Sequence, residues 1–535
     1  MKDLAKASSV TAKDRYRKLE TERNSFLDRA RECAVLTIPS ILPPSGFSSS
    51  SKLPTPYQSL GARGVRVLAS KLMLALFPQI PFFNYRVEDS ILRDLGAKRG
   101  EIEAALASRE RAVVAEVDHA VFRPVVFMCM QHLLVTGNAL LNLPASPDER
   151  AKMYRLDQYV VRRDAAGNLL EIVIREEIDQ TVLPPEILGV ILSNKQSGDR
   201  SGNTDGMTME PTPVELYTHI YLTKDNKWET YQEVEGIILP GTVGKYKKDE
   251  LPYLALRFNN QPGESYGRSY AEEYLGDLDS LEALSEALVD GSAAAAKIVF
   301  LVDPAGTTQL KVIQEARSGD IRAGRADDVS VMQLQKSQDL SIAKQQAEEI
   351  ATRLSYAFML HASVQRAGER VTAEEIRYLA ADLDDGLGGV YTLFAADLQL
   401  PIVRLFERRM EKRLGAKALD SKTVKPQVVA GLEAIGRGHD QRNLSTFVKE
   451  IIGMVGPELA LRYLNPREFM SRAAAAYNID TEGLIPSEEE VAQAEQQAQI
   501  QQIIAQLGPN AINQLGGSAN TMLKASLPPP PKAPQ

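Results

Sequence analysis

Two long segments of helical pattern flank a short stretch of different character in the second half of the chain. The first, Ser269 to Lys297, carries apolar residues at helical spacing and ends in the small-residue run Ser292 to Ala296. The second runs from Ser341 to Leu360. Two helices that flank a small module predict a helical stalk with a tip. The stalk residues expected to pack against other helices are Leu278, Leu281, Leu284, Leu288 and Ala294.

The module between these helices, from about Val302 to Gln338, is short for an independent core. It contains the apolar pair Val312-Ile313 and a predicted strand from Val329 to Leu334. Basic residues on a small domain are most often ordinary surface residues. Those in the middle part of the module are Lys311, Arg317, Arg322 and Arg325.

An arginine-containing loop follows the second helix. Thr372 and Glu375 have the spacing of a capping box, which predicts that a long helix including Arg377 begins near Thr372. Arginines on a loop between two long helices can point toward a polyanion; the alternative is a solvated, salt-bridged helix corner. The loop residues concerned are Gln365, Arg366, Gly368, Glu369 and Arg370.

The first half of the chain changes from helical to strand patterns. Helices are predicted at Thr11 to Leu36, Tyr57 to Leu76, Lys98 to Phe122 and Phe127 to Thr136, the last one ending at Gly137 as a left-handed cap. Strands are predicted at Tyr159 to Arg163, Leu169 to Arg175, Glu215 to Leu222, Trp228 to Val234 and Tyr253 to Phe258. The fold class is therefore mainly α with an inserted β-rich part (α+β).

The C-terminal region returns to helical patterns. Pro401 is expected to kink the long helix, and helices are expected from Gly431 to Tyr477. Glu488 to Leu507 has an apolar stripe typical of a bundle helix; a frayed amphipathic tail is the alternative. Pro528 to Pro531 predicts an extended end.

Charge and composition limit the partners. The net charge of −8 means that the surface as a whole repels nucleic acid, so any role with DNA must depend on local placement of charge. Cys33 and Cys129 lie far apart in apolar contexts, which predicts buried free thiols in a reducing cytoplasm. Met1 to Asp14 lacks the apolar core of a signal peptide, and the apolar run Val65 to Phe77 is shorter than the roughly 20 residues of a membrane span. No membrane partner is expected.

Signals of catalysis are weak. The sequence has no phosphate-binding loop of the ATPase type, and its five histidines never take the His-Glu-x-x-His spacing of a zinc site. Acidic clusters such as Glu272-Glu273 and Asp382-Asp384-Asp385 can hold Mg²⁺ in nucleases, but solvated helix faces explain them more simply. No catalytic residue, metal or cofactor is expected.

Several motifs resemble the portal (head-to-tail connector) proteins of short-tailed, autographivirus-type (T7-like) bacteriophages. The loop and its neighbourhood, Ser363 to Tyr378 and Leu387 to Tyr391, carry the resemblance most clearly. Other matching stretches occur in the same order along residues 10 to 485. They are Gly61 to Gly64, Leu68 to Pro78, Tyr217 to Leu222, Gly263 to Tyr270 and Gly431 to Gly438.

The resemblance implies a portal fold assembled as a ring. The implied parts are a wing at residues 1–268, a first stem helix at 269–300, a clip at 301–339, a second stem helix at 340–361, a tunnel loop at 362–371, a long wing helix at 372–430, a crown at 431–485, and a C-terminal barrel helix with a Pro-rich tail at 486–535. In such a ring each loop arginine would repeat around the axis and face DNA phosphates.

The resemblance also implies a function. The chain would form a homo-oligomer, a dodecamer, with double-stranded DNA passing through its channel at one capsid vertex of the virion, after assembly in the host cytoplasm. Implied partners are the terminase large subunit, major capsid and scaffolding proteins, and tail adaptor and internal core proteins. Two alternatives from other classes are a metal-dependent nuclease acting on phage DNA and a monomeric virion adaptor or scaffold.

Overall fold

The structure is a computed structural model, in which the chain forms two compact units. The first consists of Met1–Leu95 and Arg109–Arg437, and the second of Gly96–Ser108 and Gly438–Gln535. It describes residues 11–48, 50–77, 82–87, 99–119, 122–144, 146, 149–185, 187–189, 213–296, 299–332, 337–360, 383, 387, 393–414, 424–428, 446–454, 456, 469–470 and 497. The first turns of helix α4 (Arg99–His119) and the helical residues 446–454 belong to the second unit, and the other elements belong to the first.

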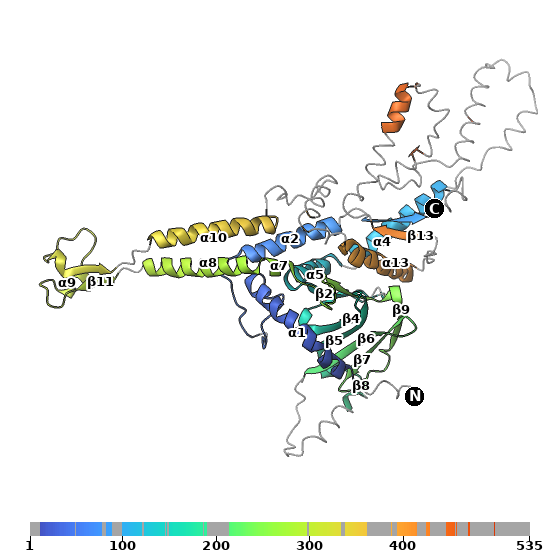
Figure 1. The fold of residues 1–535 in the computed structure, drawn as a ribbon, viewed down its shortest axis with the longest axis horizontal. Helices are drawn as coiled ribbons and strands as arrows, with labels where there is room; N and C mark the ends of the chain where they lie inside the picture. Colours follow the sequence, from blue (N-terminus) through green and yellow to red (C-terminus); the bar gives the residue numbers. More distant parts are fainter. Residues whose placement is uncertain are drawn as a thin grey trace, which may run out of the picture. The chain divides into compact units, whose positions relative to one another are not determined.

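The four helices predicted in the first part of the chain are present, and a strand that was not predicted, β1 (Phe83–Val87), lies between the second and the third. The helices are α1 (Ala12–Leu36), α2 (Leu60–Leu76), α4 (Arg99–His119) and α5 (Phe122–Thr136) (Figure 1). Thr11 caps α1, because its hydroxyl oxygen accepts a hydrogen bond from the Asp14 amide at 3.1 Å. Helix α5 begins five residues earlier than predicted. Pro124 falls in its first turn, where the missing N–H has no helical partner to lose.

The predicted hairpin strands belong to a six-stranded antiparallel sheet. Its members are β4 (Tyr159–Arg163), β5 (Leu169–Asp179), β6 (Pro213–Leu222), β7 (Lys227–Val234) and β8 (Ile237–Ile238) in that order, with β9 (Gly244–Lys247) also paired to β7. Alternation along the strands gives the sheet two apolar faces. Tyr217 and Val173 pack against Tyr16 of α1, whereas Leu216 and Val234 pack against Leu183 and Ile187.

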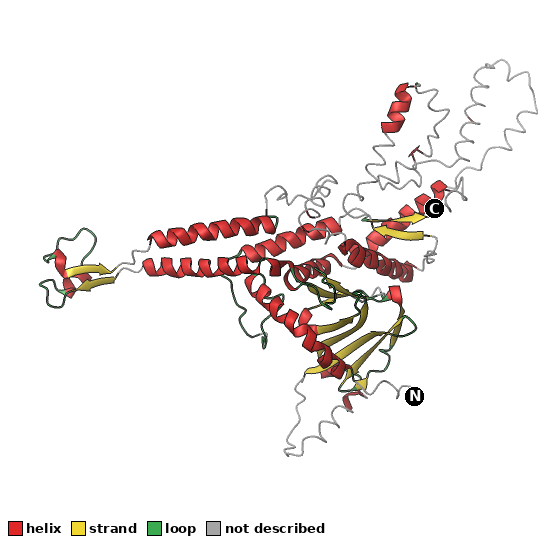
Figure 2. Ribbon diagram, viewed as in Figure 1, coloured by secondary structure: helices red, strands yellow, loops and turns green. Residues whose placement is uncertain are grey.

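A smaller sheet lies next to α5. Strand β2 (Asn138–Asn142) follows α5 directly and pairs with β3 (Lys152–Tyr154) on one side and β10 (Tyr253–Arg257) on the other. Only β10 is predicted from the sequence. Strand β2 is buried on both faces, so it lacks the alternation that identifies a half-buried strand. Figure 2 shows the strands and helices by type.

The expected long helix over residues 372–430 is wrong at its C-terminal end. Residues 400–414 form α13 (Leu400–Leu414), but β13 (Val424–Val428) is a strand that pairs antiparallel with β1 (Phe83–Val87). Pro426 removes a helical hydrogen bond, and the chain there is extended instead. The expected disturbance at Pro401 takes the form of a π-helical stretch, Ala395–Gln399, directly before α13.

Helix α13 is fixed to α4 by buried ion pairs. The Glu116 carboxylate accepts hydrogen bonds from Arg409 Nε at 3.1 Å and Arg413 Nε at 2.6 Å. The side chains of Glu116 and Arg409 are only 2% and 5% exposed, and Arg409 also donates to the carbonyl oxygens of Pro144 and Glu149. This network joins segments almost 300 residues apart in the sequence.

Candidate functional site

The helical stalk is formed by α8 (Leu275–Ala295) and α10 (Ser337–Ala357), which Figure 1 shows side by side. A short helix, α7 (Tyr270–Glu273), leads into α8 and is capped by Ser269, whose Oγ accepts a hydrogen bond from the Glu272 amide at 3.0 Å. The two long helices lie where they were predicted on either side of the short module, but Val299 and Phe300, which were expected at the end of the first one, belong to strand β11 (Val299–Val302). The segment Gly263–Tyr270, from which α7 starts, is called the stalk root below.

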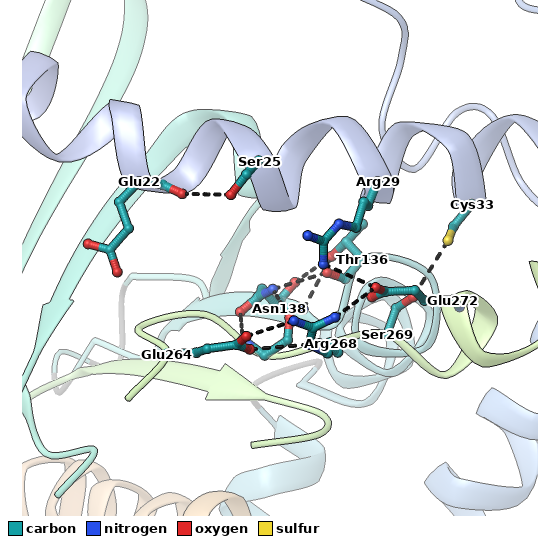
Figure 3. Close-up of polar contacts among 11 residues, drawn as sticks. Glu22, Ser25, Arg29, Cys33, Thr136, Asn138, Glu264, Arg268, Ser269 and Glu272 are labelled. Atoms are coloured by element: carbon teal, nitrogen blue, oxygen red, sulfur yellow. Dashed lines mark hydrogen bonds and ion pairs between the residues drawn. The ribbon is translucent and has the colours of Figure 1, made fainter. Parts of the chain in front are cut away.

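The stalk root is held by the side chain of Asn138 (Figure 3). Asn138 Nδ2 donates to the Gly267 carbonyl and Asn138 Oδ1 accepts from the Gly267 amide, both at 2.8 Å. Gly137 lets the two segments approach, because it has φ +72° and a Cβ there would lie 2.5 Å from the Arg268 carbonyl carbon. The predicted left-handed cap is confirmed, and its physical role is this close contact.

Charged side chains surround the same root. Arg268 donates to Glu264 at 2.7 Å, and both Arg268 and Arg29 of α1 pair with Glu272, at 3.4 and 3.3 Å (Figure 3). Cys33 of α1 lies buried beside Ser269, and burial raises the pKa of its thiol to about 11. Cys33 and Cys129 are both free and buried, as predicted. Long-range contacts of this kind have no sequence signal beyond the motif Gly263 to Tyr270 itself.

The lower part of the stalk is a packed core. Leu278, Leu281, Ile350 and Leu354 are all buried. Phe358, just beyond α10, is fully buried against Gly64 of α2, where a Cβ would lie 2.5 Å from the Phe358 ring. Gly64 of the motif Gly61 to Gly64 therefore allows close packing between α2 and the stalk, whereas a Cβ at Gly61 would lie 2.4 Å from the Leu36 carbonyl oxygen of α1.

Side chains from neighbouring helices fix the end of α10. Tyr270 Oη donates to the Ala357 carbonyl at 2.7 Å, and Lys71 Nζ of α2 donates to the Met359 carbonyl at 2.9 Å. Met359 has φ +53°, a left-handed conformation that is uncommon for a residue with a side chain. The helix thus ends at a defined point immediately before the predicted arginine loop.

The upper part of the stalk is much less covered. Leu284 and Leu288 are only half-buried and Ala294 is exposed, while Val289 is 54% and Ile342 is 63% exposed. Gly291 allows Leu340 of α10 to approach closely, since a Cβ there would lie 2.8 Å from Leu340 Cδ2. Of the five predicted packing residues, Leu278 and Leu281 are therefore already buried within the protomer. The other three retain accessible surface.

The short module forms a two-stranded sheet with a helix. Strands β11 (Val299–Val302) and β12 (Val329–Met332) pair antiparallel, and α9 (Leu310–Gln314) lies between them in sequence. Asp328 organises the connection, because its Oδ2 accepts hydrogen bonds from the amides of Thr307 and Thr308 at 2.8 and 2.9 Å. The Thr308 hydroxyl also donates to this oxygen, at 2.9 Å, and this hydrogen bond together with the amide bonds lowers the pKa of Asp328 and keeps it ionised.

The four basic residues within the described residues 299–332 are all exposed: Lys311, Arg317, Arg322 and Arg325. Lys311 pairs with Glu315 at 3.9 Å and Arg322 with Asp320 at 2.9 Å. These contacts are local, so the structure leaves the charged groups on the surface of the module.

The predicted loop lies outside the described residues. This applies to Gln365, Arg366, Gly368, Glu369 and Arg370, and to the expected helix start at Thr372, Glu375 and Arg377. The C-terminal stripe from Glu488 to Leu507 also lies outside them, apart from residue 497.

One buried cluster has the residue types of a catalytic site. Glu171 accepts from His219 at 2.8 Å, from Arg162 at 3.0 Å and from Arg15 of α1, and His219 also contacts the Tyr231 hydroxyl at 2.8 Å. These hydrogen bonds hold the pKa of Glu171 well below its usual range, against the opposing effect of burial. A carboxylate kept ionised by three partners joins α1 to the sheet and is unsuited to proton transfer at neutral pH.

Two further observations concern metal binding and membrane-spanning helices. Among the described residues, no group of three or more His, Cys, Asp or Glu side chains is arranged to hold a metal ion. None of the helices in the described part of the chain is long and apolar enough to cross a membrane.

The sequence from residue 9 to residue 485 matches the family model of the bacteriophage head to tail connecting protein. The chain is 39% identical over 523 residues to the portal protein of Enterobacteria phage T3, a match that covers 97% of this chain and 95% of the relative. It is also 39% identical over 501 residues to the portal protein of Escherichia phage T7, which covers 92% and 91%.

More distant similarities extend over much of the chain. The portal protein of Pseudomonas phage phiKMV is 31% identical over 89% of this chain and 92% of its own length. Among solved structures, the neck of a native gene transfer agent particle, computed with C12 symmetry, aligns with 78% of this chain and 89% of its own at 12% identity and a TM-score of 0.33.

Proposed function

This chain belongs to the family of bacteriophage head-to-tail connecting proteins and is a portal protein of the T7-like type, and on that basis we propose that its copies close into a ring through which double-stranded DNA passes. The observation that carries the proposal is the upper stalk, with Leu284, Leu288, Val289, Ala294 and Ile342 accessible in the protomer. Apolar surface of this extent on a narrow helical pair favours burial against neighbouring copies.

The proposed ring is a dodecamer built from heterologous contacts. One face of each stalk would meet a different face of the next, and rotation about the axis would close the ring. The small residues Ser292 to Ala296 would allow close approach of neighbouring helices. Residues 269–300 and 340–361 would then be the stem, residues 301–339 the clip, and residues 1–268 with 372–430 the wing. Residues 431–485 would form the crown and residues 486–535 the barrel helix and tail.

The loop at residues 362–371 is proposed to face the DNA. The protomer is acidic overall, so the ring would hold duplex only where basic side chains repeat around the axis. Arg366 and Arg370 next to Gly368 would supply such rings of charge, and Glu369 would weaken the attraction enough for DNA to slide. The neighbouring end of α10, fixed through Lys71 and Tyr270, would provide a rigid attachment for the loop.

Replacing both Arg366 and Arg370 by Ala is expected to leave ring assembly intact and to let packaged DNA slip back or leak. Exposed arginines contribute about 0 to 1 kcal/mol to folding, so stability should hardly change. The readout is the fraction of full-length genome retained in heads. The control replaces the exposed pair Lys245 and Lys247 by Ala. If heads made with the loop double variant retain as much full-length genome as wild type, these arginines are ordinary helix-corner residues.

We further propose that the exposed basic residues of the clip dock the terminase large subunit during packaging and the tail adaptor afterwards. Reversing Arg317, Arg322 and Arg325 to Glu is expected to weaken motor binding while the mass of the ring stays the same, because all three side chains are exposed. The measurement is in vitro packaging with purified rings. Reversal of Lys245 and Lys247 serves as the control, and normal packaging by the triple variant would remove this assignment.

The proposed location is one vertex of the capsid in the virion, with assembly in the host cytoplasm. The ring would contact major capsid and scaffolding proteins there, and internal core proteins on the head side. Neither a nuclease nor a monomeric adaptor has an observation in its favour that the portal assignment lacks. Cleavage of duplex DNA by purified protein in Mg²⁺ would support the nuclease instead.

A further inference from the structure

One guanidinium group joins three parts of the chain at the base of the stalk. Arg163 is the last residue of β4 in the six-stranded sheet, and each of its three side-chain nitrogens donates to a different backbone carbonyl. Nε donates to Ser265 of the stalk root at 3.1 Å, Nη2 to Ala255 of β10 at 2.7 Å and Nη1 to Gly167 at 3.0 Å. The two sheets and the stalk root therefore meet at one side chain.

A second arginine lies against the same segment. Arg257, the last residue of β10, donates from Nη1 to the Glu264 carbonyl of the stalk root at 2.9 Å. The root backbone lies directly on this side chain, because a Cβ at Gly267 would be 2.8 Å from Arg257 Cβ. Arg163 and Arg257 are called the root clamp below.

The root clamp places two positive charges together. Among the residues that the structure describes, neither arginine forms an ion pair. Burial, and then the charge of Arg257, lower the pKa of Arg163 to about 10, so Arg163 stays charged at neutral pH. A lysine there would lose its proton more easily. Because neighbouring like charges cost free energy, the benefit of this pair lies in the donor geometry that the two guanidinium groups supply.

A small rotation at the root is amplified along the stalk. Helix α8 has 21 residues, which corresponds to about 30 Å at 1.5 Å per residue. A tilt of about 5° at its start therefore moves its far end by about 3 Å. Leu288 and Ala294, through which neighbouring copies are proposed to meet, lie in that far half. Packed side chains at a helix contact do not accommodate a displacement of this size without repacking.

We propose that the root clamp sets the angle between wing and stalk and thereby the number of copies with which the ring closes. This inference rests on the proposed ring and names the residues that determine its closure. Copies joined through their stalks carry their wings side by side, so the angle at the root decides how neighbouring wings fit. The rotation from one copy to the next fixes the copy number, and a loose root would admit rings of other copy numbers and open arcs.

The test is the distribution of copy number among purified full-length rings, counted in end-on views by electron microscopy and checked by mass. Arg163→Lys keeps the charge but removes the planar fork of donors, and it is expected to lower the fraction of particles with the wild-type copy number at least about twofold. Arg257→Lys should act in the same direction with a smaller effect, because Arg257 makes a single carbonyl bond to the root. It also keeps the test decisive if Arg163→Lys does not fold.

Two controls separate the angle at the root from other effects. Arg155→Lys should keep the wild-type distribution, because the forked pair of Arg155 is made locally with Asp157. Glu116→Gln weakens the protomer at ion pairs that do not include the root, and it should also keep the wild-type copy number.

Two results would overturn the inference. One is a wild-type distribution for both clamp variants, which would leave the two arginines as ordinary structural residues. The other is equal broadening by Glu116→Gln, which would make the stability of the protomer the cause. Failure of the proposed function itself is distinguishable, because the wild-type protein would then form no rings.

Discussion

Leu288→Glu is expected to leave the protomer folded and to abolish ring assembly. Leu288 lies half-buried on the upper stalk, so the new carboxylate stays hydrated in the protomer but would be buried without a partner in the ring. Every interface of a closed ring carries the same defect, so assembly should fail completely. Ala294→Glu, at an exposed position of the same helix, should behave in the same way.

Two controls separate assembly from folding. Val182→Glu places the same charge at an exposed aliphatic position outside the stalk and should retain ring mass. Leu281→Glu places it at a side chain that is 5% exposed within the protomer and should unfold or aggregate the chain. Mass from light scattering and far-UV circular dichroism give the two readouts. Rings of normal mass from both Leu288→Glu and Ala294→Glu would show that the upper stalk is not the interface.

The second large effect is a loss of stability when the ion pairs between α4 and α13 are broken. Glu116→Gln keeps the shape of the side chain but leaves the Arg409 guanidinium, 5% exposed, without its carboxylate. Removing one partner of a buried ion pair costs about 3 to 5 kcal/mol. Urea unfolding should report this loss. It should be measured in the Leu288→Glu background, because ring assembly otherwise adds to the apparent stability.

A surface ion pair provides the comparison. Lys344 Nζ and Glu348 Oε1 on α10 lie 3.8 Å apart, and their side chains are 70% and 69% exposed. Lys344→Met should therefore cost at most about 0.5 kcal/mol. A loss below about 1 kcal/mol for Glu116→Gln would mean that water reaches Arg409 and that α13 is held mainly by apolar packing.

Elements with a local pattern were predictable from the sequence. The stalk helices, α1, the β4 and β5 hairpin and the cap at Gly137 each depend on spacing or on a turn residue within a few positions. Strands β2 and β13 were missed because one is buried on both faces and the other pairs with β1, more than 300 residues away. Sequence periodicity carries no information about such distant partners.

Only part of the candidate site was predictable from the sequence. The sequence identifies the apolar stripe of α8, but only the fold shows that Leu278 and Leu281 fill the protomer core while Leu288 and Ala294 do not. Similarly, the motif Gly263 to Tyr270 indicates the family, but the sequence does not show why these residues are needed. Gly267 is required because Asn138 bonds to its backbone and a Cβ there would lie 2.8 Å from the Gly137 carbonyl oxygen.

Electron microscopy of the purified, full-length protein tests the central claim most directly. We predict annular particles with a central hole, with twelve copies per particle by mass. Their stalks should lie side by side around the hole, so that Leu288 and Ala294 of each copy meet the next. Monomeric particles at micromolar concentration, or closed particles without a central hole, would contradict the account.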